Sequence, residues 1–222
     1  MDTVESRRQI GFPKERADWA KAEAIFDEHT LKIAGHPVME DWERDYMDIL
    51  AEIATSRGGH VLEVGYGLGL SARAIQAKNI VQHFVIECHP DVLSRCITEM
   101  RHPIENNRIH ILSGFWEDIT VVLANETFDG ILFDTYPLRE EEIHANHFWF
   151  FKEAYRLLKP GGVLTYYSDE AKSFSGVHMR KLLEAGFESQ NIGGEICEVS
   201  PPVDCEYWHE RTMLAPKVYK SS

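Results

Sequence analysis

The stretch His60-Val-Leu-Glu-Val-Gly-Tyr-Gly-Leu-Gly-Leu-Ser71 decides the fold of this chain. Val61, Leu62 and Val64 form a short apolar run that is typical of a buried parallel strand. The residues from Ser71 onward have a helical pattern, and between strand and helix stand Gly65, Gly67 and Gly69. A strand, a glycine turn and a helix in this order indicate a nucleotide-binding corner, because glycine lets a ligand approach the backbone and the helix start offers N–H groups.

The glycine spacing admits two cofactor classes, with a tight turn that binds nothing as the simplest alternative. Gly67, Gly69 and Ala72 fit the dinucleotide form, so the glycines alone do not exclude NAD. The form Glu63-x-Gly-x-Gly-x-Gly matches better, and Rossmann-type S-adenosylmethionine methyltransferases use it. In those enzymes the acid lies under the amino-acid end of the cofactor; a charge at the sheet edge is the alternative for Glu63. Glu87 follows Gly67 by about twenty positions, where an acid accepts hydrogen bonds from ribose hydroxyls.

Composition narrows the range of partners. The 222 residues suit one α/β domain, and 23 basic against 36 acidic side chains give a formal charge of −13. This charge argues against nucleic acid and anionic membranes as partners and leaves small or cationic substrates. No apolar run approaches ~18 residues, the start is no signal peptide, and the four cysteines lack CxxC spacing. We therefore expect a cytoplasmic monomer or homodimer without a metal site or disulfide framework.

The chain from residue 58 onward alternates between strand and helix patterns. Such alternation predicts a Rossmann-like α/β core, with a mostly parallel sheet and helices on both faces. The last two strands lie close in sequence and are expected to pair antiparallel. The predicted strands are 61–65, 83–87, 108–112, 129–133, 163–167, 192–199 and 211–218, and the predicted helices are 71–77, 90–101, 117–123, 148–158 and 177–185.

Residues 1–57 are predicted to form a mostly helical segment that covers the substrate, within a single domain of residues 1–222. Apolar residues recur at helical spacing over residues 19–33 and again over residues 38–55. On the second of these helices, Met39, Glu43 and Met47 would share one face.

Chemistry is expected beyond the carboxyl ends of the strands, where open α/β sheets bind ligands. Trp116 and Glu117 can frame a purine, by packing and by hydrogen bonding; a buried core tryptophan is the alternative. Asp134 ends a buried strand opposite the glycine corner, which favours a catalytic or substrate-binding role over simple capping of a turn.

Several longer motifs resemble guanidinoacetate N-methyltransferase. They are Pro37-Val-Met-Glu-Asp-Trp-Glu-Arg-Asp-Tyr-Met47, Phe128-Asp-Gly-Ile-Leu-Phe-Asp-Thr-Tyr-Pro137, Arg156-Leu-Leu-Lys-Pro-Gly-Gly-Val-Leu-Thr-Tyr166 and Pro201-Pro-Val-Asp-Cys-Glu-Tyr207. The likeness covers most of the chain from about residue 29 onward. Gly-Leu-Gly at 67–69 and His89-Pro-Asp-Val-Leu93 also resemble the related fungal arginine Nδ-methyltransferases.

The resemblance implies a role for each matching residue. Glu43 and Asp134 would clasp the substrate guanidinium, Asp134 would also take its proton, and Tyr136 would orient it. S-adenosylmethionine would be the cofactor and S-adenosylhomocysteine its product. The expected cofactor residues are Trp19, Met39, Met47, Glu63, Gly65, Gly67, Gly69, Leu70, Glu87, His89, Trp116 and Glu117.

The loop after the fifth strand departs from the family pattern. The family holds the substrate carboxylate there with backbone N–H groups, whereas this loop reads Ser168-Asp169-Glu170. Two acids would repel a carboxylate by about 1 kcal/mol per close pair in a watery setting. We therefore expect Asp169 and Glu170 to bind an amine-bearing guanidino substrate, arginine or an arginine-derived metabolite, with guanidinoacetate as the less favoured alternative. The alternative is that both acids point to solvent.

Guanidino N-methylation with a carboxylate base is thus the expected function, and three other classes compete with it. A catechol-type O-methyltransferase would hold Mg²⁺ with Asp134, Asp169 and Glu170. A non-catalytic domain would bind S-adenosylmethionine without turnover. An NAD-linked enzyme would need a His, Tyr-x₃-Lys or Cys arrangement for hydride chemistry, and the sequence offers none that we can place.

Overall fold

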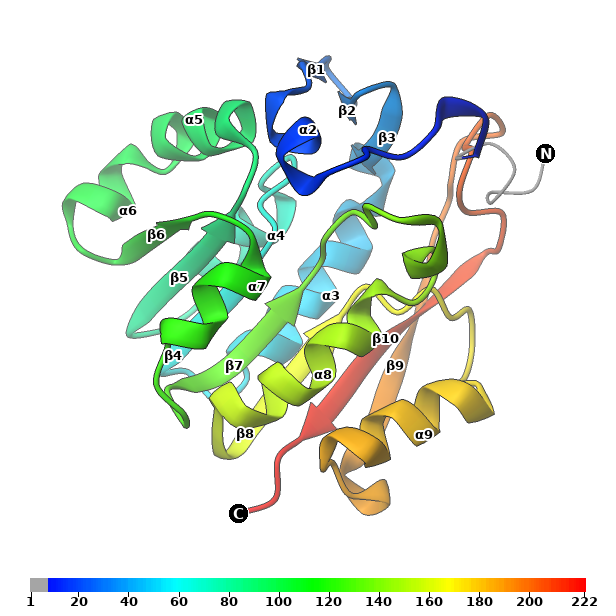
Figure 1. Cartoon of the computed structure of the whole chain (residues 1–222). Helices are drawn as coiled ribbons and strands as arrows, with labels where there is room; N and C mark the ends of the chain where they lie inside the picture. Colours follow the sequence, from blue (N-terminus) through cyan, green and yellow to red (C-terminus); the bar gives the residue numbers. More distant parts are fainter. Residues whose placement is uncertain (1–7) are drawn as a thin grey trace.

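A seven-stranded sheet with the order β6-β5-β4-β7-β8-β10-β9 forms the centre of the computed structural model, which describes residues 8–222 (Figure 1). Strands β4 to β8 are parallel, whereas β10 runs antiparallel to both β8 and β9. This arrangement confirms the predicted sheet. The strands are β4 His60–Val64, β5 Gln82–Glu87, β6 Ile109–Ser113, β7 Phe128–Phe133, β8 Leu158–Tyr166, β9 Ile192–Glu198 and β10 Thr212–Tyr219.

Helices cover both faces of this sheet, as predicted. Successive residues of β4 face opposite cores: Val61 packs in the same core as Leu50 of α3, and Leu62 packs in the same core as Phe150 of α8. The predicted helix over 90–101 is divided at Met100 into α5 and α6. The core helices are α3 Arg44–Thr55, α4 Leu70–Gln76, α5 Pro90–Glu99, α6 Arg101–Glu105, α7 Trp116–Ile119, α8 Asn146–Leu157 and α9 Gly176–Ala185.

The N-terminal segment differs from the prediction. The expected helix over residues 19–33 is wrong: after the short helix α2 (Arg16–Lys21) the chain forms a three-stranded antiparallel sheet of β1 (Ala24–Phe26), β2 (Thr30–Ile33) and β3 (His36–Glu40). Two local features break the helix. The Asp27 carboxylate accepts hydrogen bonds from the N–H groups of His29 and Thr30, which closes the turn between β1 and β2. Ala34 and Gly35 have left-handed φ angles of 52° and 82°, which turn β2 into β3.

The second predicted helix, over residues 38–55, begins later than expected. Residues up to Glu40 belong to β3, a 3₁₀ turn spans Asp41–Glu43, and only then does α3 start. Glu43 accepts a hydrogen bond from the backbone N–H of Glu40 at 2.9 Å, so this acidic turn caps the helix start. The prediction that Met39, Glu43 and Met47 share one helical face is therefore wrong, because they lie in β3, the 3₁₀ turn and α3.

Two general expectations concern the whole chain. The four cysteines are unpaired, in agreement with the absence of a disulfide framework. No helix within residues 8–222 has the length and apolar character that a membrane crossing requires.

Gly130 generates a stability prediction, because a Cβ atom there would lie 1.7 Å from the backbone oxygen of Ala54 in α3. We expect Gly130→Ala to push α3 away from β7 and to lower the free energy of unfolding by roughly 1–3 kcal/mol. Urea unfolding at constant m-value measures this change. Gly176→Ala is the control, since a Cβ at the start of α9 meets nothing within 4 Å; equal unfolding midpoints for the two variants would contradict this packing.

Candidate active site

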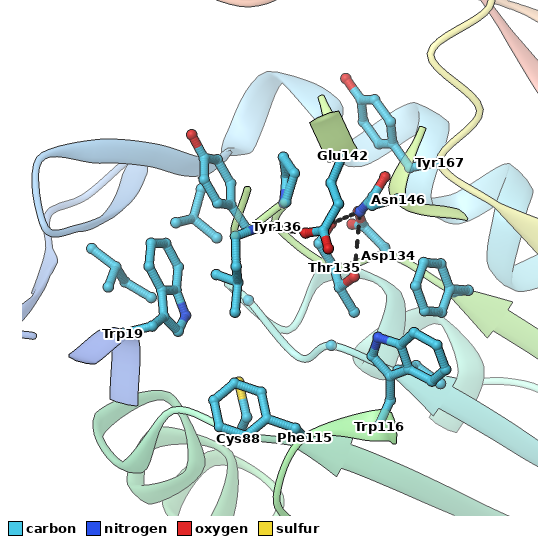
Figure 2. Close-up of a pocket in the computed structure, with 18 of the residues that line it drawn as sticks. Trp19, Cys88, Phe115, Trp116, Asp134, Thr135, Tyr136, Glu142, Asn146 and Tyr167 are labelled. Carbon is cyan, nitrogen blue, oxygen red and sulfur yellow. Dashed lines mark hydrogen bonds between the residues drawn. The ribbon is translucent and has the colours of Figure 1, made fainter. Parts of the chain in front are cut away.

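A cavity of about 420 Å³ opens beyond the carboxyl ends of β4 to β8, where the topology predicted the ligand site (Figure 2). Its walls come from the loops after these strands and from the N-terminal segment, which contributes Trp19, Leu31, Ile33 and Met39. Trp19 and Tyr136 lie toward one side of the pocket, and Trp116 lies toward the other.

The glycine loop approaches the cavity closely. At Gly65, where φ is +91°, a Cβ atom would lie 1.9 Å from the carbonyl oxygen of Asp134. At Gly67, where φ is +53°, it would lie 2.8 Å from the sulfur of Met39. Both glycines line the cavity, so the backbone itself forms this wall and a ligand can contact it directly.

Glu87 ties the glycine loop to the end of β5. It is 7% exposed and accepts hydrogen bonds from the N–H groups of Tyr66 at 2.9 Å and His89 at 2.7 Å. Burial raises the pKa of the Glu87 carboxyl. A carboxylate has about four acceptor sites, so Glu87 can also accept from the hydroxyls of a ribose in the cavity.

An aromatic and acidic wall follows β6. Trp116 stands edge-on to Phe150 with ring centroids 5.2 Å apart, and Glu117 lies 3.4 Å from the guanidinium of Arg16. Trp116, Glu117 and Arg16 all line the cavity, and burial raises the pKa of Glu117. A flat apolar surface beside a polar acceptor is what a purine ring requires.

Two carboxyl groups, Asp134 and Glu43, lie in or just behind the cavity wall. Asp134 lines the wall directly after β7, and burial together with the charges of Asp169 and Glu63 raises its pKa to about 7. Glu43 is 2% exposed and lies just outside the lining, where the hydroxyl of Tyr207 donates a hydrogen bond to it. Burial and the nearby charge of Asp134 raise the pKa of Glu43 to about 8.

The two acids of the 168–170 loop have different surroundings. Asp169 lines the cavity, with its Oδ1 2.8 Å from Nδ1 of His144. Glu170 does not line it: its Oε1 accepts from the N–H of Ser175 at 2.9 Å and lies 3.4 Å from Nδ1 of His178. The three acids of the metal-dependent alternative therefore do not converge, and no group of three or more potential ligands able to hold a metal ion occurs among residues 8–222.

Tyr136 connects the 134–138 loop to the N-terminal segment. Its ring stacks on Trp19 with centroids 5.2 Å apart, and its hydroxyl lies 2.9 Å from Nδ1 of His36. Nε2 of His36 in turn lies 2.7 Å from the carbonyl oxygen of Gly11. Tyr136 and Trp19 both line the cavity, so this stack forms part of its cover.

Several predicted site residues lie outside the cavity lining. Glu63 is fully buried, accepts a hydrogen bond from the hydroxyl of Ser71 and lies 3.0 Å from Nε2 of His83. Nε2 of His89 lies 2.9 Å from the carbonyl oxygen of Ala22, and the His89 side chain caps the start of α5. Also outside the lining are Glu43, Met47, Gly69, Leu70 and Glu170.

The cavity also contains residues that sequence reasoning did not assign to it. Tyr207 belongs to a tail motif that carried the family resemblance, so a signal for it existed. His144, Glu142 and Asn146 follow β7 by more than seven positions in a segment without a recognisable pattern. Asn146 donates a hydrogen bond to the carbonyl of Thr135, which holds the loop beneath Asp134 in place (Figure 2).

Comparisons with known proteins find relatives of similar sequence among fungal proteins. The chain is 32% identical over 139 residues to protein arginine N-methyltransferase 2 of Yarrowia lipolytica, and the match covers 59% of this chain and 28% of that protein. It is 30% identical over 139 residues to the protein of the same name from Saccharomyces cerevisiae, with 59% and 32% covered. The chain thus matches about a third of the length of these relatives.

Solved structures share the fold at low sequence identity. Spermidine synthase from Thermotoga maritima superposes with a TM-score of 0.64 at 15% identity, covering 90% of this chain and 72% of that one. Precorrin-6y C5,15-methyltransferase from Geobacter metallireducens gives a TM-score of 0.55 at 13% identity, covering 78% and 87%.

The profile of the family described as guanidinoacetate N-methyltransferase matches residues 13–221, nearly the whole chain. With its Rossmann-like sheet, its glycine loop and its acidic cavity, the chain belongs to the guanidinoacetate N-methyltransferase family of S-adenosylmethionine-dependent methyltransferases.

Proposed function

We propose that this protein methylates a nitrogen of the guanidino group of a small molecule, arginine or an arginine-derived compound, with Asp134 as the base. The observation that carries the proposal is the pair of acids Asp134, half-buried in the cavity wall, and Glu43, buried just outside the lining, whose pKa the charge of Asp134 raises. The names of the fungal relatives and of the matching family both point to guanidino substrates.

The two carboxyl groups suit a guanidinium ion. A guanidinium stays protonated in water, with a pKa above about 12, and offers a planar set of N–H donors that carboxylates match. Burial and neighbouring carboxylates raise the pKa of both acids, because each charge would lose water and face a like charge. A bound guanidinium would supply a compensating cation, so both acids would ionise when the substrate binds.

Asp134 is assigned the base because it lines the cavity, whereas Glu43 is held behind it by Tyr207 and the backbone of Glu40. A delocalised cation is a poor nucleophile, and methyl transfer needs an in-line nitrogen lone pair. A carboxylate beside that nitrogen can draw off the proton as the new C–N bond forms, since methylation itself acidifies the nitrogen. Glu43 would orient the guanidinium in the plane that presents this nitrogen.

Other residues of the cavity lining fit an adenosyl cofactor. Gly65 and Gly67 leave backbone exposed to the ligand, Glu87 has acceptor capacity for ribose hydroxyls, and Trp116 with Glu117 suits a purine. When bound, S-adenosylmethionine supplies an electrophilic methyl group on its sulfonium. Trp19 and Tyr136 would help to exclude water from the reacting groups, since their stacked rings form part of the cavity cover.

The first prediction concerns substrate class and metal dependence. We expect methyl transfer from S-adenosylmethionine to arginine or agmatine, unchanged by EDTA, and no transfer to a catechol. A radiolabelled methyl assay with each compound, with and without EDTA, measures this. Activity on the catechol that EDTA abolishes would support the O-methyltransferase alternative, and S-adenosylmethionine binding without any turnover would support a non-catalytic domain.

The second prediction concerns the base. We expect Asp134→Asn to lower kcat by about 10²- to 10⁴-fold, which is the usual contribution of a general base. Affinity for S-adenosylhomocysteine, measured by calorimetry, should stay within about twofold, because the proposed cofactor contacts lie elsewhere. Asp48→Asn is the control, since Asp48 of α3 is exposed and lies outside the cavity lining. A lost cofactor affinity with kcat retained would show that Asp134 is not the base.

The third prediction concerns pH. In the ligand-free protein the pKa values of Asp134 and Glu43 are about 7 and about 8, above their ordinary range, so both acids hold protons at pH 6. A guanidinium favours their charged forms, so its binding releases protons and its Kd should fall as pH rises from 6 to 8. Calorimetry in buffers of different ionisation enthalpy counts the released protons.

The same shifts set a direction for stability. A carboxyl group whose pKa is raised by folding adds to the free energy of unfolding at pH values below its unfolded pKa, which is near 4. That contribution is lost as the pH rises through the folded pKa values of about 7 and about 8. We therefore expect Glu43→Gln to reduce the loss of Tm between pH 6 and 9 in the ligand-free protein. An unchanged loss, with no protons released on guanidinium binding, would contradict the assigned pKa values.

A further inference from the structure

Asp169 is the acid of the 168–170 loop that lines the cavity, and its backbone has an unusual conformation. It has a left-handed φ of 55°, which is uncommon for a residue with a side chain. Its neighbour Glu170 turns the other way, toward Ser175 and His178. The loop thus brings one carboxylate to the site and uses the other for its own structure.

The sheet register places the start of the loop that carries Asp169 beside the proposed base. Phe133 pairs with Tyr166, and the N–H of Tyr167 donates to the carbonyl of Phe133 at 3.1 Å, so Asp134 and Tyr167 lie side by side. Asp169 follows two residues later. Both acids line the cavity, and they are near enough for the charge of Asp169 to raise the pKa of Asp134.

We propose that Asp169 binds a protonated amine at the far end of the guanidino substrate, so that the cavity selects guanidino compounds carrying an amine about four carbons from the guanidine. This inference rests on the proposed function. In an extended arginine or agmatine the amine lies about 7 Å from the guanidine carbon, so one ligand can reach from Asp134 to a second acid of the same cavity. In guanidinoacetate a carboxylate lies about 4 Å away and would fall between Asp134 and Asp169.

The surroundings of Asp169 suit an ammonium ligand. Nδ1 of His144 lies 2.8 Å from Oδ1, and Nδ1 of the buried His147 lies 3.9 Å from Oδ2. His144 can donate from Nδ1 in its neutral or its protonated form, so it orients the carboxylate in either state. A carboxylate has about four acceptor sites, and it can therefore hold His144 and a ligand ammonium together.

A matched ligand series tests the inference on the full chain. Agmatine, n-butylguanidine and 4-guanidinobutanoate share the guanidine and carry an amine, no charge or a carboxylate at the other end. We expect kcat/KM for agmatine to exceed that for n-butylguanidine by about 10- to 100-fold, the range of a charge-assisted hydrogen bond. The carboxylate compound should be the poorest of the three. Arginine should likewise exceed Nα-acetylargininamide, which has no ammonium.

Two variants separate the neighbouring acids. Asp169→Asn should reduce the preference for agmatine over n-butylguanidine to within about threefold; this ratio is the readout, because the charge of Asp169 also acts on Asp134 and its loss affects both substrates alike. Asparagine tolerates a left-handed φ and can still accept from His144, so the variant is expected to fold. Glu170→Gln is the control and should retain the wild-type preference, because Glu170 lies outside the cavity lining.

The outcomes distinguish the two proposals. Methylation of all three compounds without preference for the amine, or a preference that Asp169→Asn leaves intact, would overturn the inference and leave guanidino methylation standing. Equal turnover of Nα-acetylargininamide and arginine would also overturn it and would favour peptide-bound arginine. No methylation of any guanidino compound would refute the proposed function, and the inference with it.

Discussion

The contact between the ends of β4 and β7 is the constraint on which the site depends. The N–H of Asp134 donates to the carbonyl of Val64 at 2.9 Å, and the next residue, Gly65, leaves no room for a side chain against the Asp134 carbonyl. The glycine loop and Asp134 therefore share one junction between two central, fully hydrogen-bonded strands. Group transfer requires donor and acceptor to be held to a fraction of an ångström, and strands hold residues more exactly than loops do. Cofactor wall and candidate base can only move together.

This junction explains which parts of the molecule could be predicted from sequence. Residues directly after a strand, such as Glu87, Trp116 and Asp134, reach the cavity because parallel strands end at one edge, and a strand pattern is enough to find them. The structure of the N-terminal segment did not follow from its sequence pattern. Its apolar residues fit a helical period, whereas the Asp27 turn and the left-handed Ala34 impose strands. Tyr207 and His144 reach the cavity through loops, and no periodicity states where a loop returns. Their positions depend on tertiary packing alone.

The two acids Glu43 and Asp134 have an electrostatic cost in the ligand-free protein. Glu43 and Asp134 are held close enough to raise the pKa of Glu43, in surroundings that disfavour charge on either group. Filling this volume with apolar side chains would stabilise the fold more simply, since buried charges rarely add stability. Retaining two such acids, of which Glu43 accepts hydrogen bonds from Tyr207 and from the backbone of Glu40, is typical of a site organised for a cationic ligand. The formal charge of −13 adds a long-range field of the same sign.

Substrate choice in such a site would be decided far from the reacting nitrogen. In the proposed arrangement the guanidine end is satisfied by Glu43 and Asp134 whatever the rest of the ligand carries, so it cannot discriminate among guanidino compounds. Discrimination is a difference between two affinities, and a single carboxylate at Asp169 acts on both: it attracts an ammonium tail and repels a carboxylate tail. Because Glu170 is turned toward Ser175 and His178, one side chain sets this preference. A change of substrate would then need a change in the loop after β8 and none in the catalytic pair.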